Sequence, residues 1–315
     1  MKTLTLSFVL LTFIFSLVSC EEEKTSGVVD NFEVAKSNKA REMDPSVSTS
    51  QMDQLVEGNT QFALDLYSEI TDTEEGNFFY SPFSISIAMA MTFAGAEGTT
   101  ETEMADVMNF ILPEPELHAA FNALDMDLAT RGTGDASQFR LNIANAIWGQ
   151  VGYSFEQAFL DTIALNYGSG LNLLDFASDP DGARVTINDW VEEKTEDRIQ
   201  DLLPEGSITN YTKLVLTNAI YFWGEWVEMF SRDMTNPALF HKDDGTDVSV
   251  DFMNTETSFN YFAGTGYEVI ELPYKGDDTS MVIIAPDAGT MDTFQATLDA
   301  SFINGALSGL VSTHM

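Results

Sequence analysis

The residues that most often carry out enzymatic chemistry are few and scattered in this chain. Its three histidines, His118, His241 and His314, lie far apart, and its single cysteine is Cys20. It contains neither the G-x-S-x-G nucleophile motif nor the H-E-x-x-H zinc motif. We therefore expect surface histidines, no catalytic residues, no metal and no other cofactor. A Ser-His-Asp triad assembled from distant residues stays open, because its order along a chain is not fixed.

Two acidic turns have the residue types of calcium loops but not their spacing. They are D-P-D-G at 179–182 and D-D-G at 243–245, the latter followed by Asp247. An EF-hand loop alternates its oxygen ligands along the chain, and neither turn does so. Because Asp, Pro and Gly are also common turn residues, we interpret both segments as turns. The chain has no glycine-rich loop that would bind phosphate.

The segment 77–100, N-F-F-Y-S-P-F-S-I-S-I-A-M-A-M-T-F-A-G-A-E-G-T-T, contains several boundary signals. Residues 78–80 are typical of a short strand. Ser81 can cap a following helix, and Pro82 suits its first position. Residues 83–94 lack charge and are apolar on nearly all sides, which predicts a buried helix ending at Gly95, too short to span a bilayer. Thr100 and Glu103 have capping-box spacing for the next helix.

Hydrophobic periodicity predicts further elements of both kinds, which follow one another without regular alternation. Helices are expected at 55–70, 117–128, 183–199 and 294–310, the last with a glycine break, and from a Ser154–Gln157 capping box to 167. Strands are expected at 139–148, 171–176, 214–222, 235–240 and 248–253. This mixture predicts an α+β fold.

The composition restricts the classes of partner. The chain has 315 residues, with 14 Lys and Arg against 50 Asp and Glu, which gives a net charge of −36. Such an anionic surface repels nucleic acid, so we expect no DNA or RNA partner. Hydrophobic residues make up 44% of the chain, which is sufficient for a large core. We interpret the excess of acid as a contribution to solubility.

The first twenty residues have the pattern of an export signal. Lys2 precedes an apolar run at 4–18, and the run is followed by Cys20. This ending resembles the bacterial lipoprotein cleavage box, which implies lipidation of Cys20 and anchoring to the cell envelope. The three glutamates at 21–23 resemble the acidic residues that accompany display on the outer surface in some bacterial groups. The alternative is an incidental cysteine in a signal that is cut elsewhere. We predict a signal at 1–20, a flexible polar tether at 21–51 and a folded domain at 52–315.

The chain resembles the serpin family of serine-protease inhibitors in at least five segments between about residues 52 and 310. The 77–100 segment carries the pattern N-x-x-x-S-P-x-S-I followed by G-A-x-G-x-T. Similar wording occurs at 59–67 (N-x-x-F-A-x-x-L-Y), 141–148 (L-N-I-A-N-A-I-W), 187–199 (I-N-D-W-V-E-E-K-T-E-D-R-I), 216–226 (L-T-N-A-I-Y-F-W-G-E-W), 272–276 (L-P-Y-x-G) and 280–286 (S-M-x-I-x-x-P). The resemblance implies a serpin fold, with mixed multi-strand sheets and about eight or nine helices. Trp223 departs from the family, in which a lysine usually precedes this glycine.

The resemblance also implies roles for individual residues. Positions matching Ser81, Ser84 and Asn218 form a polar cluster under the main sheet in serpins, where two strands part. Buried hydroxyl and amide groups need hydrogen-bond partners, and such a network can support two arrangements of a sheet. Trp226 matches an aromatic residue at the top of that sheet. The alternative is that these residues are a helix cap, an ordinary core Asn and a core Trp.

Serpins present a bait loop to a serine protease, or to a papain-like cysteine protease. After cleavage, the loop inserts into the main sheet as an extra strand. The resemblance places this loop after Leu310, and we find no hinge sequence before Met315. We therefore expect the fold to be incomplete at its C-terminus, with the reactive bond outside this sequence and the chain itself inactive. The alternative function is a non-inhibitory serpin scaffold that binds at the cell surface.

Overall fold

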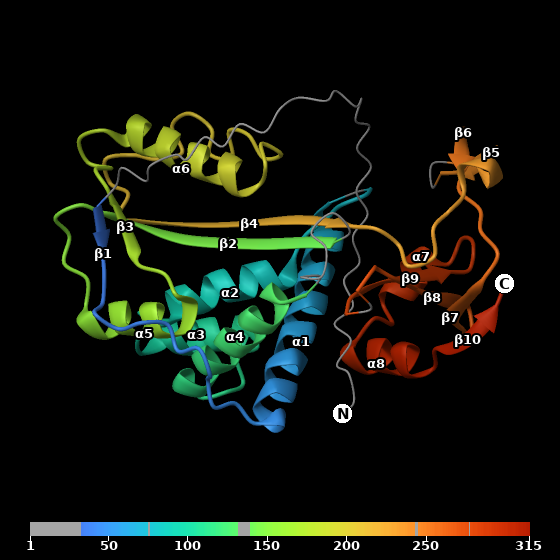
Figure 1. Ribbon diagram of the computed structural model, residues 1–315, viewed down its shortest axis with the longest axis horizontal. Helices are drawn as coiled ribbons and strands as arrows, with labels where there is room; N and C mark the ends of the chain where they lie inside the picture. Colours follow the sequence, from blue (N-terminus) through green and yellow to red (C-terminus); the bar gives the residue numbers. More distant parts are fainter. Residues whose placement is uncertain (1–32, 75, 132–138, 243–244, 277) are drawn as a thin grey trace. The chain divides into compact units, whose positions relative to one another are not determined.

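The computed structural model describes residues 33–315, apart from 75, 132–138, 243–244 and 277 (Figure 1). They form two compact units. The described residues of the first lie within 33–130 and 141–222, and those of the second lie within 131–140 and 223–315. The fold is α+β, with eight α-helices and three sheets among the described residues, as the sequence predicts.

The main sheet has four strands in the order β1-β3-β2-β4. These strands are β1 (Glu33–Ala35), β2 (Phe139–Gln150), β3 (Leu171–Leu174) and β4 (Leu214–Gly224). Strand β3 pairs with β2 in parallel and with β1 in antiparallel orientation. The sheet therefore has β1 at one edge and β4 at the other, within the part of the chain that the structure describes.

Six helices belong to the first unit: α1 (Thr49–Thr73), α2 (Pro82–Phe93), α3 (Thr99–Met108), α4 (Glu114–Ala129), α5 (Gln157–Tyr167) and α6 (Pro180–Lys194). Figure 1 shows α6 on one face of the main sheet and α2 on the other. Met91 of α2 packs with Ile147 of β2 and Leu171 of β3, whereas Ile187 of α6 packs with Trp148. The sheet is thus buried on both faces, because alternate residues of each strand point to opposite sides.

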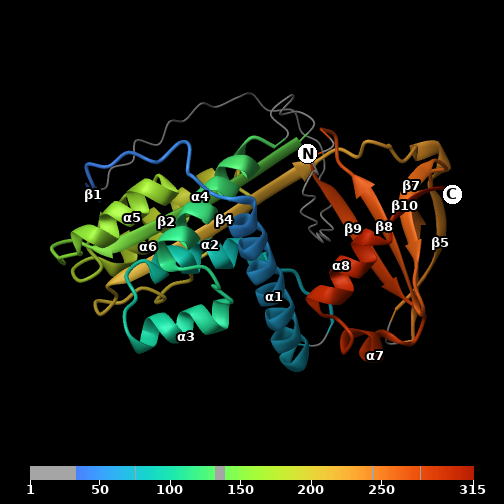
Figure 2. The same ribbon diagram turned by 90° about the horizontal axis from the view of Figure 1, so that it is seen from below.

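The second unit contains a sheet in the order β10-β7-β8-β9, in which all neighbouring strands are antiparallel. Its strands are β7 (Ser258–Ala263), β8 (Tyr267–Pro273), β9 (Ser280–Pro286) and β10 (Val311–His314), and its helices are α7 (Met291–Gln295) and α8 (Ala300–Ser308). Val269, Val282 and Ala306 form its buried core. Figure 2 shows α8 beside this sheet.

A separate hairpin in this unit pairs β5 (Asn236–His241) with β6 (Asp247–Phe252). Large apolar side chains of both strands are exposed, with Leu239 at 56% and Phe240 at 52% of their full accessible surface. The second unit also has a short 3-10 turn, Arg232–Met234.

Several predicted boundaries are confirmed and others are wrong. Ser81 caps α2 with Pro82 in the first turn, but residues 78–80 form no strand. Their aromatic side chains pack against α1 instead: Phe78 lies 5.5 Å from Tyr67 between ring centroids, and Tyr80 donates to the Ala63 carbonyl at 2.6 Å.

Both predicted capping boxes are wrong, as is the single helix over 294–310. Helix α3 begins after Gly98 and α5 begins after Glu156, in both cases without a side-chain cap. The 294–310 stretch splits into α7 and α8 because Asp299 caps the second helix, accepting from Phe302 N at 2.6 Å. Local polar spacing was a weaker guide than hydrophobic periodicity.

The tether that composition predicts at 21–51 differs from the structure over its second half. Residues 33–35 are strand β1, and α1 already begins at Thr49, with Ser48 and Gln51 forming a capping box. The stabilising contacts of residues 33–42 are to distant parts of the chain, which a local composition does not show. Residues 1–32, including Cys20, lie outside the described residues. Among the described helices, none combines the length and apolar character needed to cross a bilayer.

Candidate functional site

The start of α2 carries two of the predicted cluster residues in direct contact. Ser81 Oγ donates to Ser84 Oγ at 2.9 Å and accepts from Ser84 N at 3.4 Å. Ser84 is 3% exposed. Two residues further along α2, the Ser86 hydroxyl is fully buried and has no hydrogen-bond partner among the described residues. Since a buried unpaired hydroxyl is destabilising, this end of α2 is a region of incomplete polar pairing.

The third predicted residue, Asn218 of β4, binds Asn145 of β2, which the sequence patterns did not indicate as part of the cluster. Asn218 Nδ2 donates to Asn145 Oδ1 of β2 at 2.5 Å. On β2, Asn145 has the same parity as Ile147, and on β4, Asn218 has the same parity as Leu216. Because Ile147 and Leu216 pack in the cluster that contains Met91 of α2, the amide pair lies on the α2 face.

The described hydrogen bonds therefore form two pairs, Ser81–Ser84 and Asn145–Asn218. No hydrogen bond joins the two pairs in the part of the chain that the structure describes. The signal for Asn145 was present in the sequence: an asparagine stands on the apolar side of the L-N-I-A-N-A-I-W strand. A half-buried amide on the apolar side of a strand needs a partner, and the neighbouring strand supplies one.

The opposite face of the sheet holds β2 to β4 by a second side-chain bond. Trp148 is fully buried, and its Nε1 donates to Thr217 Oγ1 at 2.9 Å. The Trp190 ring, from α6, packs nearly perpendicular to the Trp148 ring, with 5.6 Å between centroids. Strands β2 and β4 are thus joined by polar side chains on both faces of the sheet.

Strand β4 stands last in the order of strands that the described residues form. An edge strand presents backbone N–H and C=O groups on its outer side, and these groups can pair with an added strand. From Leu214 to Ile220 the strand is half-buried or buried, because α2 and α6 cover its faces. This arrangement suits the acceptance of one further strand, since only the edge is open to pairing.

Trp226, the predicted top-of-sheet aromatic, lies two residues after β4 and belongs to the second unit. It stacks on Tyr274 with 4.5 Å between ring centroids and forms a β-bridge with it. A Cβ at Gly224 would lie 2.8 Å from the Tyr274 ring, so the glycine permits this packing. Burial raises the pKa of Tyr274 to about 12. Trp223 accepts a cation–π contact from Arg140 at 5.5 Å.

Comparison with known proteins decides the family. A profile described as Serpin (serine protease inhibitor) matches residues 57–315. The chain belongs to the serpin family. It is 36% identical over 275 residues to an uncharacterized serpin-like protein of Methanosarcina mazei, which covers 86% of the chain and 64% of that protein. It is 40% identical over 239 residues to the human leukocyte elastase inhibitor, which covers 75% of the chain and 62% of that protein.

Among solved structures, emu ovalbumin matches this serpin with a TM-score of 0.77 and 26% sequence identity. The match covers 83% of the chain and 72% of ovalbumin. The chain thus spans slightly less than two thirds of the length of the two curated relatives above. The fold expected from the sequence motifs is confirmed.

The histidines of this serpin are placed differently from one another. His241 and His314 are exposed, as predicted, and pair with Asp247 at 2.6 Å and Glu256 at 3.7 Å. His118 was expected on the surface, and this is wrong, because its side chain is 2% exposed. Its Nδ1 lies 2.7 Å from the Tyr167 hydroxyl, and burial lowers the pKa of His118 to about 4.

The acidic turn at 179–182 serves the helix that follows it. Asp179 Oδ1 accepts from Gly182 N at 3.0 Å, which caps α6, and Asp181 pairs with Arg184 at 2.7 Å. This use agrees with the interpretation as a turn. In the other turn, residues 243–244 lie outside the described residues. No group of three or more potential metal ligands occurs among the residues that the structure describes.

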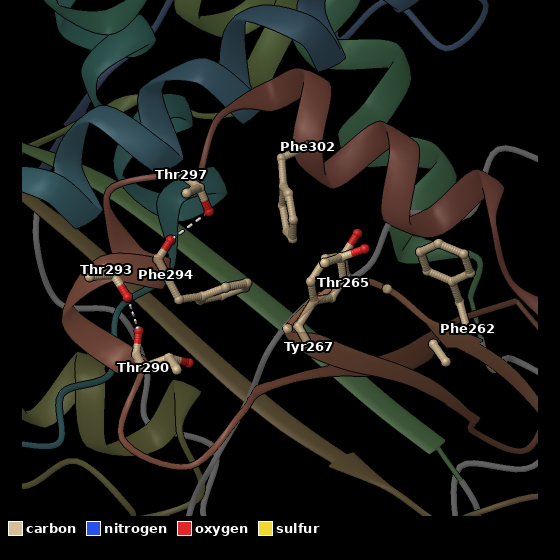
Figure 3. Close-up of a pocket in the computed structure, with 11 residues that line it drawn as sticks. Phe262, Thr265, Tyr267, Thr290, Thr293, Phe294, Thr297 and Phe302 are labelled. Atoms are coloured by element: carbon tan, nitrogen blue, oxygen red, sulfur yellow. Dashed lines mark hydrogen bonds between the residues drawn. The ribbon is translucent and has the colours of Figure 1, made fainter.

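The second unit also contains a pocket of about 770 Å³ (Figure 3). The rings of Tyr267, Phe294 and Phe302 converge there, and the ring centroids of Tyr267 and Phe302 are 4.8 Å apart. The Thr293 and Thr297 hydroxyls bond to carbonyls of their own helical turns. The rings of this pocket mainly pack against each other, and it lacks a charged group aimed into it among its lining residues.

Proposed function

We propose that this serpin chain is part of an inhibitor of serine proteases that acts by inserting a cleaved bait loop beside β4. The single observation that carries the proposal is that β4 stands last in the strand order of a sheet covered on both faces, within the part of the chain that the structure describes. Identity of 40% to the human leukocyte elastase inhibitor supports it. The protein would act on proteases as a bait, not as an enzyme of its own.

The chemistry follows from strand addition. The protease serine attacks a peptide bond of the bait, the amine product leaves, and an ester joins the protease to the cleaved loop. Insertion of that loop next to Leu214–Ile220 would add main-chain hydrogen bonds and bury alternate side chains against α2 and α6. The Asn145–Asn218 pair and the Trp148–Thr217 bond would keep β4 in register with β2 during insertion.

The acceptance of a strand can be measured directly with added peptides. An acetylated twelve-residue peptide of alternating Thr and Ala should slow amide hydrogen exchange of Leu214–Ile220. A matched peptide with proline at alternate positions cannot donate the required hydrogen bonds and should have no effect. Equal exchange with and without the first peptide would overturn the role of β4.

The chain of residues 1–315 should not form a covalent complex on its own. We expect no SDS-stable band after incubation with elastase-, trypsin- or subtilisin-like enzymes, because the bait hinge is not found within this sequence. A shifted band that contains both proteins would contradict this. Where a bait loop is present, small residues in its hinge would favour inhibition over a scaffold that only binds.

We also propose export and lipid anchoring through Cys20. The apolar run at 4–18 and the position of the cysteine support this proposal. Expression in a bacterial host with a radiolabelled or alkyne-labelled fatty acid should label the protein and place it in the membrane fraction. Cys20→Ser should remove the label. Labelling that survives this substitution would contradict the site.

A further inference from the structure

Residues 33–42, here called the N-terminal strap, contact three elements of the first unit. The strap starts as β1 on the edge of β3, passes α5 and reaches α4 before α1 begins (Figure 1). Its sequence is E-V-A-K-S-N-K-A-R-E, with three basic and two acidic residues, so its net charge is 3 − 2 = +1. In a chain of net charge −36, this segment is a basic ligand for an acidic surface.

The first part of the strap is a strand that fits a groove made by a glycine. Val34 and Ala35 pair with Asn172 and Leu171 of β3 in antiparallel register. A Cβ at Gly170 would lie 2.5 Å from Val34 Cγ1 and 3.3 Å from the Ala35 carbonyl oxygen. The backbone of Gly170 is not in the left-handed region, so its own conformation does not require glycine. The strap does.

The last part of the strap places an arginine against a buried amide. Arg41 Nε donates to Asn122 Oδ1 at 2.8 Å, and Arg41 Nη2 binds Asp125 Oδ2 at 2.6 Å. Asn122 is fully buried, and its Nδ2 donates to the Glu42 carbonyl at 2.8 Å. Both ends of the Asn122 amide are therefore satisfied by the strap. A buried amide left without these partners would be costly.

Two further contacts fix the middle of the strap and its exit. Ser37 Oγ donates to Asp161 Oδ1 of α5, and this hydroxyl, with Gln157, holds the pKa of Asp161 below its usual range. Glu42 N donates to the Leu165 carbonyl at 2.9 Å. The strap thus makes contacts at its start, middle and end, all through residues distant in the sequence.

We propose that α4, α5 and β3 form a peptide-recognition site, and that residues 33–42 occupy it as a detachable strand that closes the β3 edge. The site binds an extended segment that has an aliphatic residue over Gly170 and, seven positions later, an arginine that contacts Asn122 and Asp125. When the strap leaves, the β3 edge and the Asn122 amide become available to another segment of this type.

The first test uses the intact chain and amide hydrogen exchange. Exchange at Val34, Ala35 and Leu171–Leu174 should be slow in the wild type. Gly170→Val places a methyl-bearing carbon where Val34 lies, so exchange at these amides should rise by at least about tenfold. Asn38→Ala is the matched control, since Asn38 is exposed within the strap. Equally fast exchange in the wild type would show that the strap is not docked.

The second test asks whether the strap binds without its covalent connection. A specific protease site inserted at Asp44, in the exposed stretch before α1, allows cleavage after folding. The fragment containing residues 33–42 should stay bound during gel filtration at low salt. Arg41→Ala should weaken its binding by about 10- to 100-fold, since hydrogen bonds to charged groups are lost, whereas Asn38→Ala should not.

Two results of the second test would overturn the proposal. The first is loss of the wild-type fragment immediately after cleavage. The second is equal retention of the Arg41→Ala and Asn38→Ala fragments, which would show that the arginine site does not contribute. Binding that weakens as salt rises would agree with an Arg41–Asp125 contact, and salt-independent binding would contradict it.

Discussion

The backbone N–H and C=O groups on the outer sides of β3 and β4 are treated differently in the main sheet. At the β3 edge, the N-terminal strap pairs with the strand, and its side chains reach α4 and α5. At the β4 edge, the side chains of Asn145 and Trp148 of β2 form hydrogen bonds with side chains of β4. The β3 edge is closed by β1, which becomes the short edge strand on that side, whereas β4 is the edge strand on the other side among the described residues and its register is fixed. A sheet can thus direct strand addition to one side.

The largest expected effect concerns the closed edge. Asn122→Ala removes a fully buried amide that binds Arg41 and Glu42, and it leaves a small cavity. We expect a loss of about 2–4 kcal/mol in the free energy of unfolding, measured by urea denaturation. Asn142→Ala, at an exposed position of β2, is the control and should change stability by less than about 0.5 kcal/mol. A similar small loss for both would weaken the contrast between the edges.

Acid should also act on the closed edge first, through His118 of α4. The folded pKa of about 4 lies below the ordinary value of 6.5, so the unfolded chain binds the proton more readily. The resulting stability is present above pH 6.5 and is lost as pH falls toward 4, by up to about 3 kcal/mol. Glu114 on α4 and Tyr167 on α5 face this ring, at 3.5 and 2.7 Å.

The pH effect can be assigned with one variant. His118→Gln should flatten the dependence of the unfolding free energy on pH between 6.5 and 4. The protection factors of the strap amides, which are corrected for the intrinsic pH dependence of exchange, should fall in acid in the wild type, while those of Leu214–Ile220 should change less. An unchanged slope in the variant would mean that another group causes the acid sensitivity.

At the β4 edge the expected effects are smaller. Thr217→Val keeps the shape of the side chain but leaves the buried Trp148 Nε1 without its acceptor. We expect a loss of about 1–2 kcal/mol and faster exchange in β4, with the strap unaffected. Faster exchange in the strap as well would show that the two edges are coupled through β2.

The smallest expected effect belongs to the half-buried amide pair. Asn218→Ala should lower the free energy of unfolding by about 0.5–1 kcal/mol, since Asn145 can recover part of its hydrogen bonding from solvent. A double-mutant cycle with Asn145→Ala isolates their interaction. A coupling energy near zero would mean that the 2.5 Å contact does not hold β4 in register.

Much of the fold could be predicted from the sequence because its elements have strong local patterns. The apolar run of α2 and the alternation of β2 both gave the right element. The strap could not be predicted in this way. Val34 needs Gly170, and Arg41 needs Asn122, across separations that a polar and unpatterned segment does not reveal.

The candidate site was predictable only in part for a similar reason. Ser81 and Ser84 are three residues apart, and their contact follows from helix geometry. The partner of Asn218 is 73 positions away, so pairing of β2 with β4 had to be known first. His118 was misplaced because its residue type was weighed without its position: it lies three residues before Phe121, on the same buried face of α4.

The exposed β5–β6 hairpin has a consequence for how copies of this protein behave in solution. Leu239, Phe240 and Val248 present apolar surface that would attract a second molecule, while a net charge of −36 keeps molecules apart. This repulsion weakens when carboxylates are protonated, and at 1 M salt it extends only about 3 Å. The protein should therefore remain dispersed at neutral pH and low ionic strength, and cluster in strong salt or acid.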